Sequence, residues 1–131
     1  MTLKKDIENR KDVNNLVTQF YKKIRKDDLL GPIFNKAIAD WPINLEHLTD
    51  FWETQLFFVA KFKGNPILKH QVVDAESNYT IEALHFGVWL NYWFETLDAL
   101  FEGDRAVVAK NRARNMGSHF YLKLFEARPK S

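Results

Sequence analysis

The sequence predicts an all-α protein, and three observations support that class. Apolar residues recur at helical spacing in four long segments, no segment shows a convincing strand alternation, and glycine, proline or capping residues separate the segments. The chain has 131 residues, a length that fits one domain with one core. We expect a single domain over residues 1–131, with an N-terminal extension (1–11) and a loosely ordered tail (127–131).

The first long helix is expected to begin after Asp12, which is a plausible N-cap. The apolar stripe behind it follows the spacing i, i+3, i+4, i+7, i+8 and i+11. Its members are Val13, Leu16, Val17, Phe20, Tyr21 and Ile24. The stretch GPIFNKAI (31–38) then opens with a Gly-Pro break and predicts a short helix or turn.

The second long helix is expected within DWPINLEHLTDFWETQLFFVAKF (40–62), with Asp40 as its cap and Pro42 near its first turn. Its apolar positions again keep helical spacing: Leu45, Leu48, Phe51, Trp52, Leu56 and Val59. Gly64 and Pro66 break the pattern and leave the short segment GNPILKHQVVD (64–74), which contains one histidine.

Two further long helices are expected to complete the chain. SNYTIEALHFGVWLNYWFETLDALF (77–101) has Asn78 or Thr80 as a cap and is apolar almost all round, so much of it should be buried. EGDRAVVAKNRARNMGSHFYLKLFEA (102–127) has Asp104 as its expected cap. Four apolar residues mark one side of this last helix: Val108, Met116, Phe120 and Leu124.

The composition narrows the function. Aromatic residues make up 15% of the chain, which indicates a core of large flat side chains or a core with a large flat guest. The net charge of +2 gives no reason to expect nucleic acid as a partner. The absence of cysteine excludes disulfides, zinc–thiolate sites, iron–sulfur clusters and thiol nucleophiles. No signal peptide or membrane span is visible, so we expect a soluble cytoplasmic protein with no membrane partner.

The four histidines form no HxxxH or HExxH pair, and the chain contains no GxSxG, P-loop or GxGxxG motif. A single histidine in a helical protein is usually a surface residue or a satisfied half-buried one. His70 has an unusual setting, because its short segment makes few contacts of its own. A bond from His70 to a metal inside a bound cofactor would hold that segment in place.

Two polar aromatic residues occupy apolar helix positions. Tyr21 lies on the stripe of the first helix, and Trp89 lies in the middle of the most apolar helix. A buried hydroxyl or indole N–H requires a hydrogen-bond partner. One interpretation is ordinary core packing with backbone carbonyls as partners; the other is a pocket in which both donors point at a polar ligand.

Four stretches in order resemble the truncated haemoglobins of group III, a family of two-on-two globins. They are FYKKIRKDDLLGPIF (20–34), WPINLEHLTDFW (41–52), GNPILKH (64–70) and HFGVWLNYWFETL (85–97). The resemblance runs in register from about Val13 to the last helix, and the chain has no Gly-Gly, in keeping with this group. It implies a shortened globin with two antiparallel helix pairs around one haem b (iron protoporphyrin IX).

The resemblance also implies roles for individual residues. His70 matches the proximal histidine that ligates the iron, while Tyr21 and Trp89 match distal donors to a bound ligand. Phe34 matches a phenylalanine at the haem edge. The remaining residues expected around the haem are His47, Leu48, Phe51, Trp52 and Lys69.

One position departs from the family pattern. Members often carry Trp-x-x-His at the start of the distal helix, and here Asn44 stands in place of that histidine, with His47 one turn later. We hypothesise that Asn44 lies at the distal gate and that His47 lies nearer the haem rim or solvent. The cations that could pair with haem propionates are Lys61, Lys63, Lys69 and Arg25.

The resemblance implies binding of O2, NO, CO, cyanide or similar small ligands by a monomer. Distal donors that hold a partly negative ligand slow its release, which argues against a simple oxygen shuttle. Nitric oxide detoxification or peroxide handling is the alternative within haem chemistry, and it would need an external reductase because the chain has no flavin or nicotinamide motif. A cofactor-free helical interaction domain is the alternative from another class.

Overall fold

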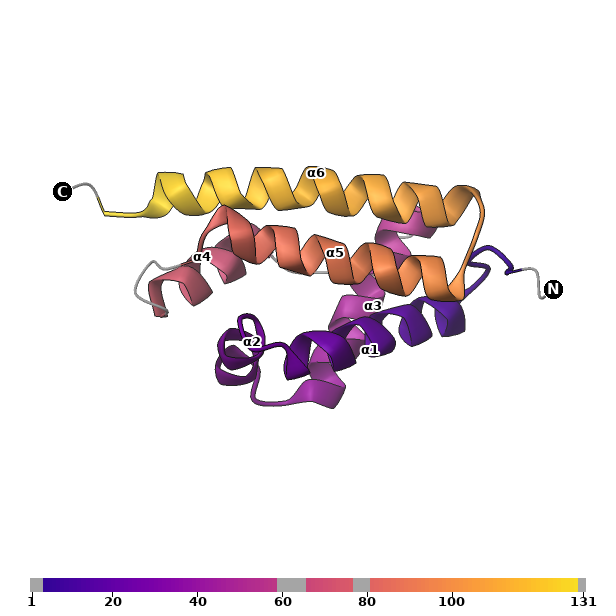
Figure 1. Ribbon diagram of the computed structural model, residues 1–131, viewed down its shortest axis with the longest axis horizontal. Coiled ribbons are helices and arrows are strands. Elements are labelled where there is room, and N and C mark those ends of the chain that lie inside the picture. The colour runs from indigo at the N-terminus through magenta and orange to yellow at the C-terminus, as the bar shows by residue number, and fades with distance from the viewer. Residues whose placement is uncertain (1–3, 59–65, 77–80, 130–131) are drawn as a thin grey trace.

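The computed structural model describes residues 4–58, 66–76 and 81–129, and within these residues the chain forms six helices and no strand (Figure 1). This confirms the predicted all-α class. The helices are α1 (Arg10–Lys26), α2 (Gly31–Ala37), α3 (Trp41–Phe57), α4 (Pro66–Glu76), α5 (Ala83–Leu100) and α6 (Asp104–Ala127). None of the described helices has the length and hydropathy needed to cross a membrane.

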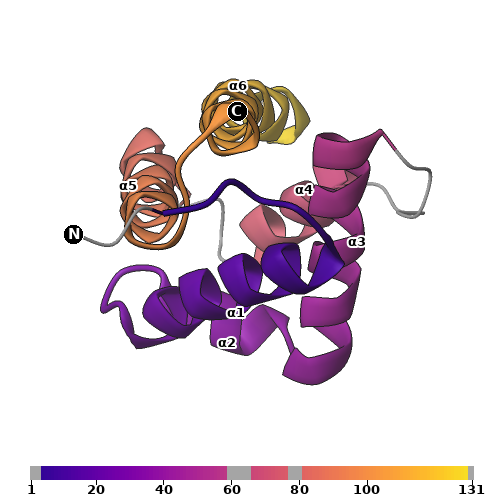
Figure 2. The same cartoon turned by 90° about the vertical axis from the view of Figure 1, so that its right-hand side faces the viewer.

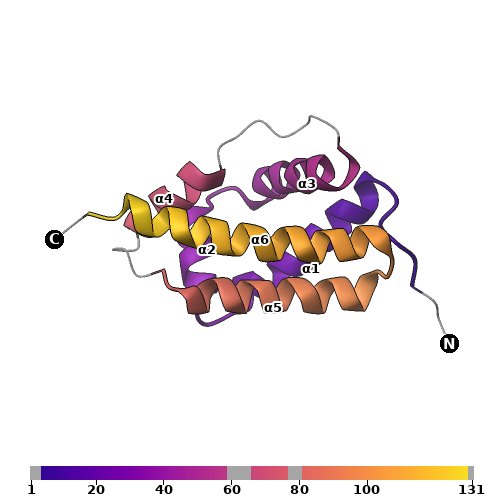
Figure 3. The ribbon, with the colours of Figure 1, turned by 90° about the horizontal axis from the view of Figure 1, so that it is seen from above.

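The helices form two packed pairs. α5 and α6 lie side by side along the length of the molecule and run in opposite directions (Figures 1 and 3). α1 packs on both α5 and α3, and α3 crosses α1 steeply (Figure 2). The short helix α4 packs on α6, near the C-terminal end of the chain (Figure 1). This arrangement is the two-over-two helical sandwich that the family resemblance implied.

The stripe predicted for the first helix is confirmed, because all six of its residues are buried in α1. The predicted cap is wrong. Asn9, not Asp12, is the N-cap, and its side-chain oxygen accepts from the Asp12 backbone N–H at 3.0 Å. The Asp12 carboxylate in turn accepts from the Glu8 backbone N–H at 2.9 Å. Asp12 therefore stabilises the start of α1 from within the first turn, where its negative charge also interacts favourably with the helix dipole.

α3 and α5 both begin with caps supplied by neighbouring residues. Asp40 is confirmed as the cap of α3, since its Oδ1 accepts from the Ile43 N–H at 3.1 Å. Asn78 and Thr80 lie outside the described residues, and the N-cap of α5 is Glu82. His85 completes this capping box by accepting the Glu82 N–H on its Nδ1 at 2.9 Å.

The start of α6 depends on the N-terminal segment. Asp104 is the first helical residue and not the cap, so the prediction there is wrong. The carboxylate of Asp6 accepts from the N–H groups of Arg105 at 2.9 Å and Ala106 at 3.0 Å. Ile7, next in the chain, is fully buried. Part of the expected N-terminal extension therefore packs on the domain and caps its last helix.

An aromatic cluster forms the centre of the core between α1, α3 and α5. Trp93 is fully buried, stacks on Trp52 with ring centroids 4.4 Å apart, and meets the edge of Phe20 at 4.9 Å. Its indole N–H donates to the Ala109 carbonyl on α6 at 3.1 Å. Large flat side chains thus fill this part of the core, as the composition suggested.

The expectation that much of α5 is buried is confirmed only in part. Only Trp93, Thr96 and Leu97 are fully buried, and Leu84 near the helix start is exposed. Most of the other apolar residues on α5, including Trp89, are partly buried against the core. α1 and α6 contact only part of the circumference of α5, so an apolar sequence on all sides does not lead to burial on all sides.

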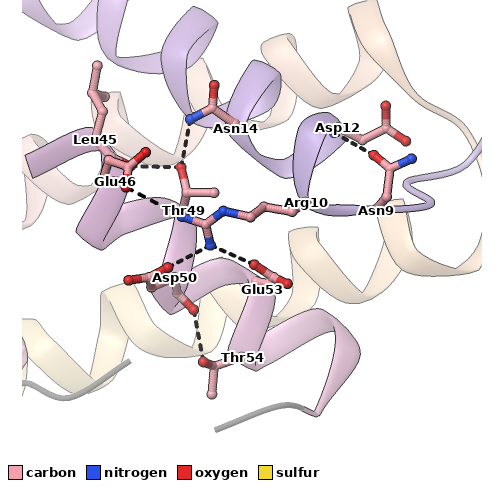
Figure 4. A network of polar contacts seen from close by, with 10 residues as sticks. All are labelled: Asn9, Arg10, Asp12, Asn14, Leu45, Glu46, Thr49, Asp50, Glu53 and Thr54. Atoms are coloured by element: carbon pink, nitrogen blue, oxygen red, sulfur yellow. Dashed lines mark hydrogen bonds and ion pairs between the residues drawn. The ribbon is translucent and has the colours of Figure 1, made fainter. Parts of the chain in front are cut away.

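A polar network joins the start of α1 to α3 (Figure 4). Arg10 Nη1 donates to Asp50 Oδ1 at 2.6 Å and to Glu53 Oε2 at 2.7 Å, and these hydrogen bonds raise the pKa of the guanidinium. Asn14 Nδ2 donates to Thr49 Oγ1 at 3.1 Å. The network fixes α1, which carries Tyr21, against α3.

Candidate functional site

Tyr21 lies at the junction of α1, α2 and α3 with 6% of its surface exposed. Its ring lies 5.8 Å from that of Phe34 on α2 and 5.8 Å from that of Trp41 at the start of α3. Burial raises the pKa of Tyr21 to about 12, and a hydrogen bond with the Trp89 side chain offsets part of the rise. The phenol is therefore neutral at physiological pH and keeps its hydrogen.

The contact between Tyr21 and Trp89 has a defined direction. An indole N–H can only donate, so Trp89 donates and the Tyr21 oxygen accepts. Within the residues that the structure describes, the Tyr21 hydroxyl donates to no protein acceptor. A buried phenol with an uncommitted O–H is an unusual feature of a core, and it fits a place where a ligand supplies the acceptor. Trp89 is thus one side-chain partner of Tyr21, and the choice between the two earlier interpretations stays a prediction.

The residues expected on the distal helix divide by exposure. Asn44, Leu48 and Phe51 are spaced four and three apart, share one face of α3, and are all half-buried. His47 is exposed. This pattern agrees with the hypothesis that Asn44 points inward and His47 toward solvent, while the gating role itself stays a prediction.

Trp52 and Phe34 contribute to the site through packing. Trp52 is 2% exposed and stacks on Trp93, so it belongs to the aromatic core behind the half-buried face of α3. Phe51 meets the edge of Trp52 at 5.5 Å between ring centroids. Phe34 is half-buried beside Tyr21. These rings form a rigid support for the residues in front of them.

His70 lies on α4, the eleven-residue helix that begins at Pro66. Its ring is half-buried and lies 4.8 Å from the ring of Phe120 on α6, with the two planes tilted by 39°. Lys69 beside it is exposed, as a partner for a surface carboxylate must be. Gly64, expected to end the preceding helix, lies outside the described residues. The short segment singled out in the sequence thus forms a helix that presents one histidine against the α6 side of the fold.

The other candidates have structural explanations or lie outside the described residues. His85 completes the capping box of α5, and His119 is exposed on α6. Arg25 lies 4.5 Å above the ring of Trp41 in a cation–π contact. Lys61 and Lys63 fall outside the described residues. Where the structure describes the chain, no three His, Cys, Asp or Glu side chains gather to hold a metal ion by themselves.

Sequence reasoning missed one polar feature close to His70. Asp74, one helical turn later, is 1% exposed and pairs with Arg128 beyond the end of α6. Arg128 belongs to the tail that we expected to be loosely ordered, and this ion pair corrects that expectation at its position. The signal available in the sequence was the i, i+4 spacing of His70 and Asp74, which places both on one side of α4.

The fold is that of a shortened globin, and comparisons with known proteins agree. No family model matches the chain. The group 3 truncated hemoglobin ctb of Campylobacter jejuni is 30% identical over 122 residues, which cover 90% of this chain and 92% of that protein. The crystal structure of group III truncated hemoglobin from Campylobacter jejuni matches with a TM-score of 0.83 and 28% identity. That match covers 98% of this chain and 100% of the other.

The chain therefore belongs to the group III truncated haemoglobins. Membership supports haem binding and a globin type of ligand binding.

Proposed function

We propose that this protein binds haem b through His70 and uses the bound haem to hold O2 and other small diatomic ligands. Family membership supports the cofactor. The donor set also fits it: a half-buried imidazole on a short helix, a phenol hydrogen with no acceptor among the described residues, and a core of stacked flat rings. When bound, haem would supply an iron that can take a small ligand.

The observation that carries this proposal is the state of the Tyr21 hydroxyl. Its pKa of about 12 keeps it protonated, and its oxygen already accepts from Trp89. Its hydrogen is thus available to a ligand that carries partial negative charge. In this arrangement Tyr21 is the direct donor, and Trp89 holds the phenol in position from behind.

The remaining pocket residues have supporting roles in this proposal. Asn44 is half-buried, and its amide can donate a hydrogen bond while carrying no charge at any pH. Leu48 and Phe51 on the same face of α3 exclude water, which strengthens hydrogen bonds made inside the pocket. Lys69, which is exposed beside His70, would pair with a haem propionate.

The expected effect on ligand release is substantial. A hydrogen bond to a charged partner contributes about 1.5–3 kcal/mol, which slows dissociation by about ten- to 150-fold. A protein built to deliver oxygen must release it readily. The Tyr21 donor therefore favours retention of the ligand, or chemistry on it with an external reductase, over transport.

The test combines a visible spectrum with variants. Purified protein reconstituted with haem should show a Soret band, and His70→Ala should lose the ferrous five-coordinate spectrum or the haem. Tyr21→Phe should raise the O2 dissociation rate about tenfold or more. Trp89→Phe should raise it less, because that variant only loosens the phenol.

Tyr92→Phe is the matched control, since Tyr92 is a phenol on α5 whose hydroxyl donates to Asp27 at 2.6 Å. It should leave the O2 dissociation rate unchanged. A wild-type protein without a Soret band after haem addition would overturn the proposal. Unchanged dissociation rates in both Tyr21→Phe and Trp89→Phe would overturn the donor assignment alone.

A further inference from the structure

The carboxylate of Asp74 is buried on α4 one turn after His70, with 1% of the residue exposed. A buried carboxylate is unfavourable unless charged and polar partners surround it. Arg128 provides them with two parallel bonds, from Nε to Oδ2 at 2.9 Å and from Nη2 to Oδ1 at 3.0 Å. The Ile81 backbone N–H adds a third, longer bond to Oδ1 at 3.3 Å.

Arg128 completes this cluster by also donating from Nη2 to the Ile81 carbonyl. We call Asp74, Ile81 and Arg128 the Asp74 cluster. It joins three places in the fold: the last part of α4, the residue just before the N-cap of α5, and the C-cap of α6. The hydrogen bond to Asp74 is the main cause of a raised pKa at the Arg128 guanidinium. A planar bidentate pair of this kind fixes orientation as well as distance.

The position of α4 depends on such contacts. A helix of eleven residues is too short to be stable alone in water. In the described part of the chain, α4 packs mainly on α6. Besides the Asp74 cluster, the contacts between them include the His70–Phe120 ring pair and a bond from Gln71 Nε2 to the Lys123 carbonyl at 3.1 Å. The Asp74 cluster is the charged, buried one among these contacts.

We propose that Asp74 and Arg128 are positioning residues that hold α4, and with it the iron-ligating ring of His70, at a fixed place and tilt. This inference rests on the proposed function, because it assigns the Asp74 cluster an effect on the iron ligand His70. His70 and Asp74 are four residues apart on one helix, so a displacement of α4 at Asp74 also displaces His70. The Asp74 cluster thereby links Arg128, which follows α6, to the position of His70 on α4.

The experiment uses the full chain reconstituted with haem, and it compares wild type with Asp74→Asn, Arg128→Gln and Arg128→Lys. Two quantities are measured: the iron–histidine stretching band of the ferrous protein by resonance Raman spectroscopy, and the rate of haem transfer to an excess of apomyoglobin. Asp74→Asn and Arg128→Gln should shift or broaden the band and raise the transfer rate about tenfold. Arg128→Lys keeps the charge but loses the bidentate geometry, so its effects should be intermediate.

The matched control is Arg10→Gln, which breaks the ion pair to Glu53, the other carboxylate that is buried among the described residues, and does not involve α4. It should lower the stability of the protein and leave the iron–histidine band where it is. A loss of stability alone therefore does not reproduce the expected result. Arg128 follows α6, so its variants replace no helical residue and keep the test decisive if Asp74→Asn fails to fold.

The outcomes separate this inference from the proposed function. If wild type shows no iron–histidine band, or if His70→Ala retains it, the proposed function fails. If wild type shows the band and His70→Ala loses it, but the Arg128 variants keep both the band and the transfer rate of wild type, the proposed function stands. In that case the positioning role is wrong.

Discussion

The buried phenol of Tyr21 should make the stability of this protein fall at high pH. The pKa of Tyr21 is about 12 in the folded chain, against about 10 for an exposed tyrosine. In the unfolded chain the phenol therefore loses its proton above about pH 10, while in the folded chain it keeps it until about pH 12. The unfolded state then gains the favourable ionisation first, so the free energy of unfolding decreases as pH rises through this window.

The size of the effect follows from the two pKa values. One unit of pKa difference corresponds to 1.36 kcal/mol, so a difference of about two units gives about 2.7 kcal/mol once the pH exceeds both values. At pH 11 about half of this, about 1.4 kcal/mol, is already lost. Tyr21→Phe has no proton to lose at this position. The decline in its free energy of unfolding between pH 8 and pH 11 should therefore be about 1.4 kcal/mol smaller than the decline in wild type.

The assay is urea unfolding followed by circular dichroism at pH 8, 9, 10 and 11, with wild type and variant in the same haem state. Lysines and the other tyrosines titrate in both proteins, so their contributions cancel in the difference. Tyr121→Phe is the control, because it removes a half-buried phenol on α6 but leaves Tyr21 in place and should retain the wild-type loss at Tyr21. If wild type and Tyr21→Phe decline in parallel up to pH 11, the burial argument for the Tyr21 pKa is refuted.

Four further changes test the fold. Asp6→Ala removes the acceptor for two N–H groups at the start of α6 and should lower the free energy of unfolding by about 1 kcal/mol in a urea titration; an unchanged midpoint would contradict this capping role. Gly87→Ala should raise the free energy of unfolding by about 0.5–1 kcal/mol, because Gly87 is inside α5 and an added Cβ meets no atom within 4 Å. Gly103→Ala should lower the free energy of unfolding, because φ is 144° there and the added Cβ would lie 2.6 Å from Asp6 Cγ. Equal thermal midpoints for Gly87→Ala and Gly103→Ala would contradict this expectation. Trp93→Phe should lower the free energy of unfolding by about 2 kcal/mol through loss of the bond to the Ala109 carbonyl and of stacking area, and a loss below the error of a urea titration would contradict it.

The sequence alone determined what depends on neighbours within a few turns. The stripe of α1 predicted its buried face residue by residue, because helical spacing fixes which side chains share a side. Asp40 was correctly predicted as a cap, since an N-cap contacts N–H groups only two or three residues ahead. The all-α class and the family also followed from the sequence, from periodicity in one case and from the order of four motifs in the other.

The tertiary structure decided the contacts between residues that are far apart along the chain. The cap of α6 comes from Asp6, about a hundred residues earlier, and no local pattern around Asp104 could reveal it. The same is true of the Asp74–Arg128 pair and of the bond between Trp89 and Tyr21. Each of these depends on which helix faces display polar atoms to one another after packing. Sequence spacing defines the faces of single helices, and only the packed fold decides which faces meet.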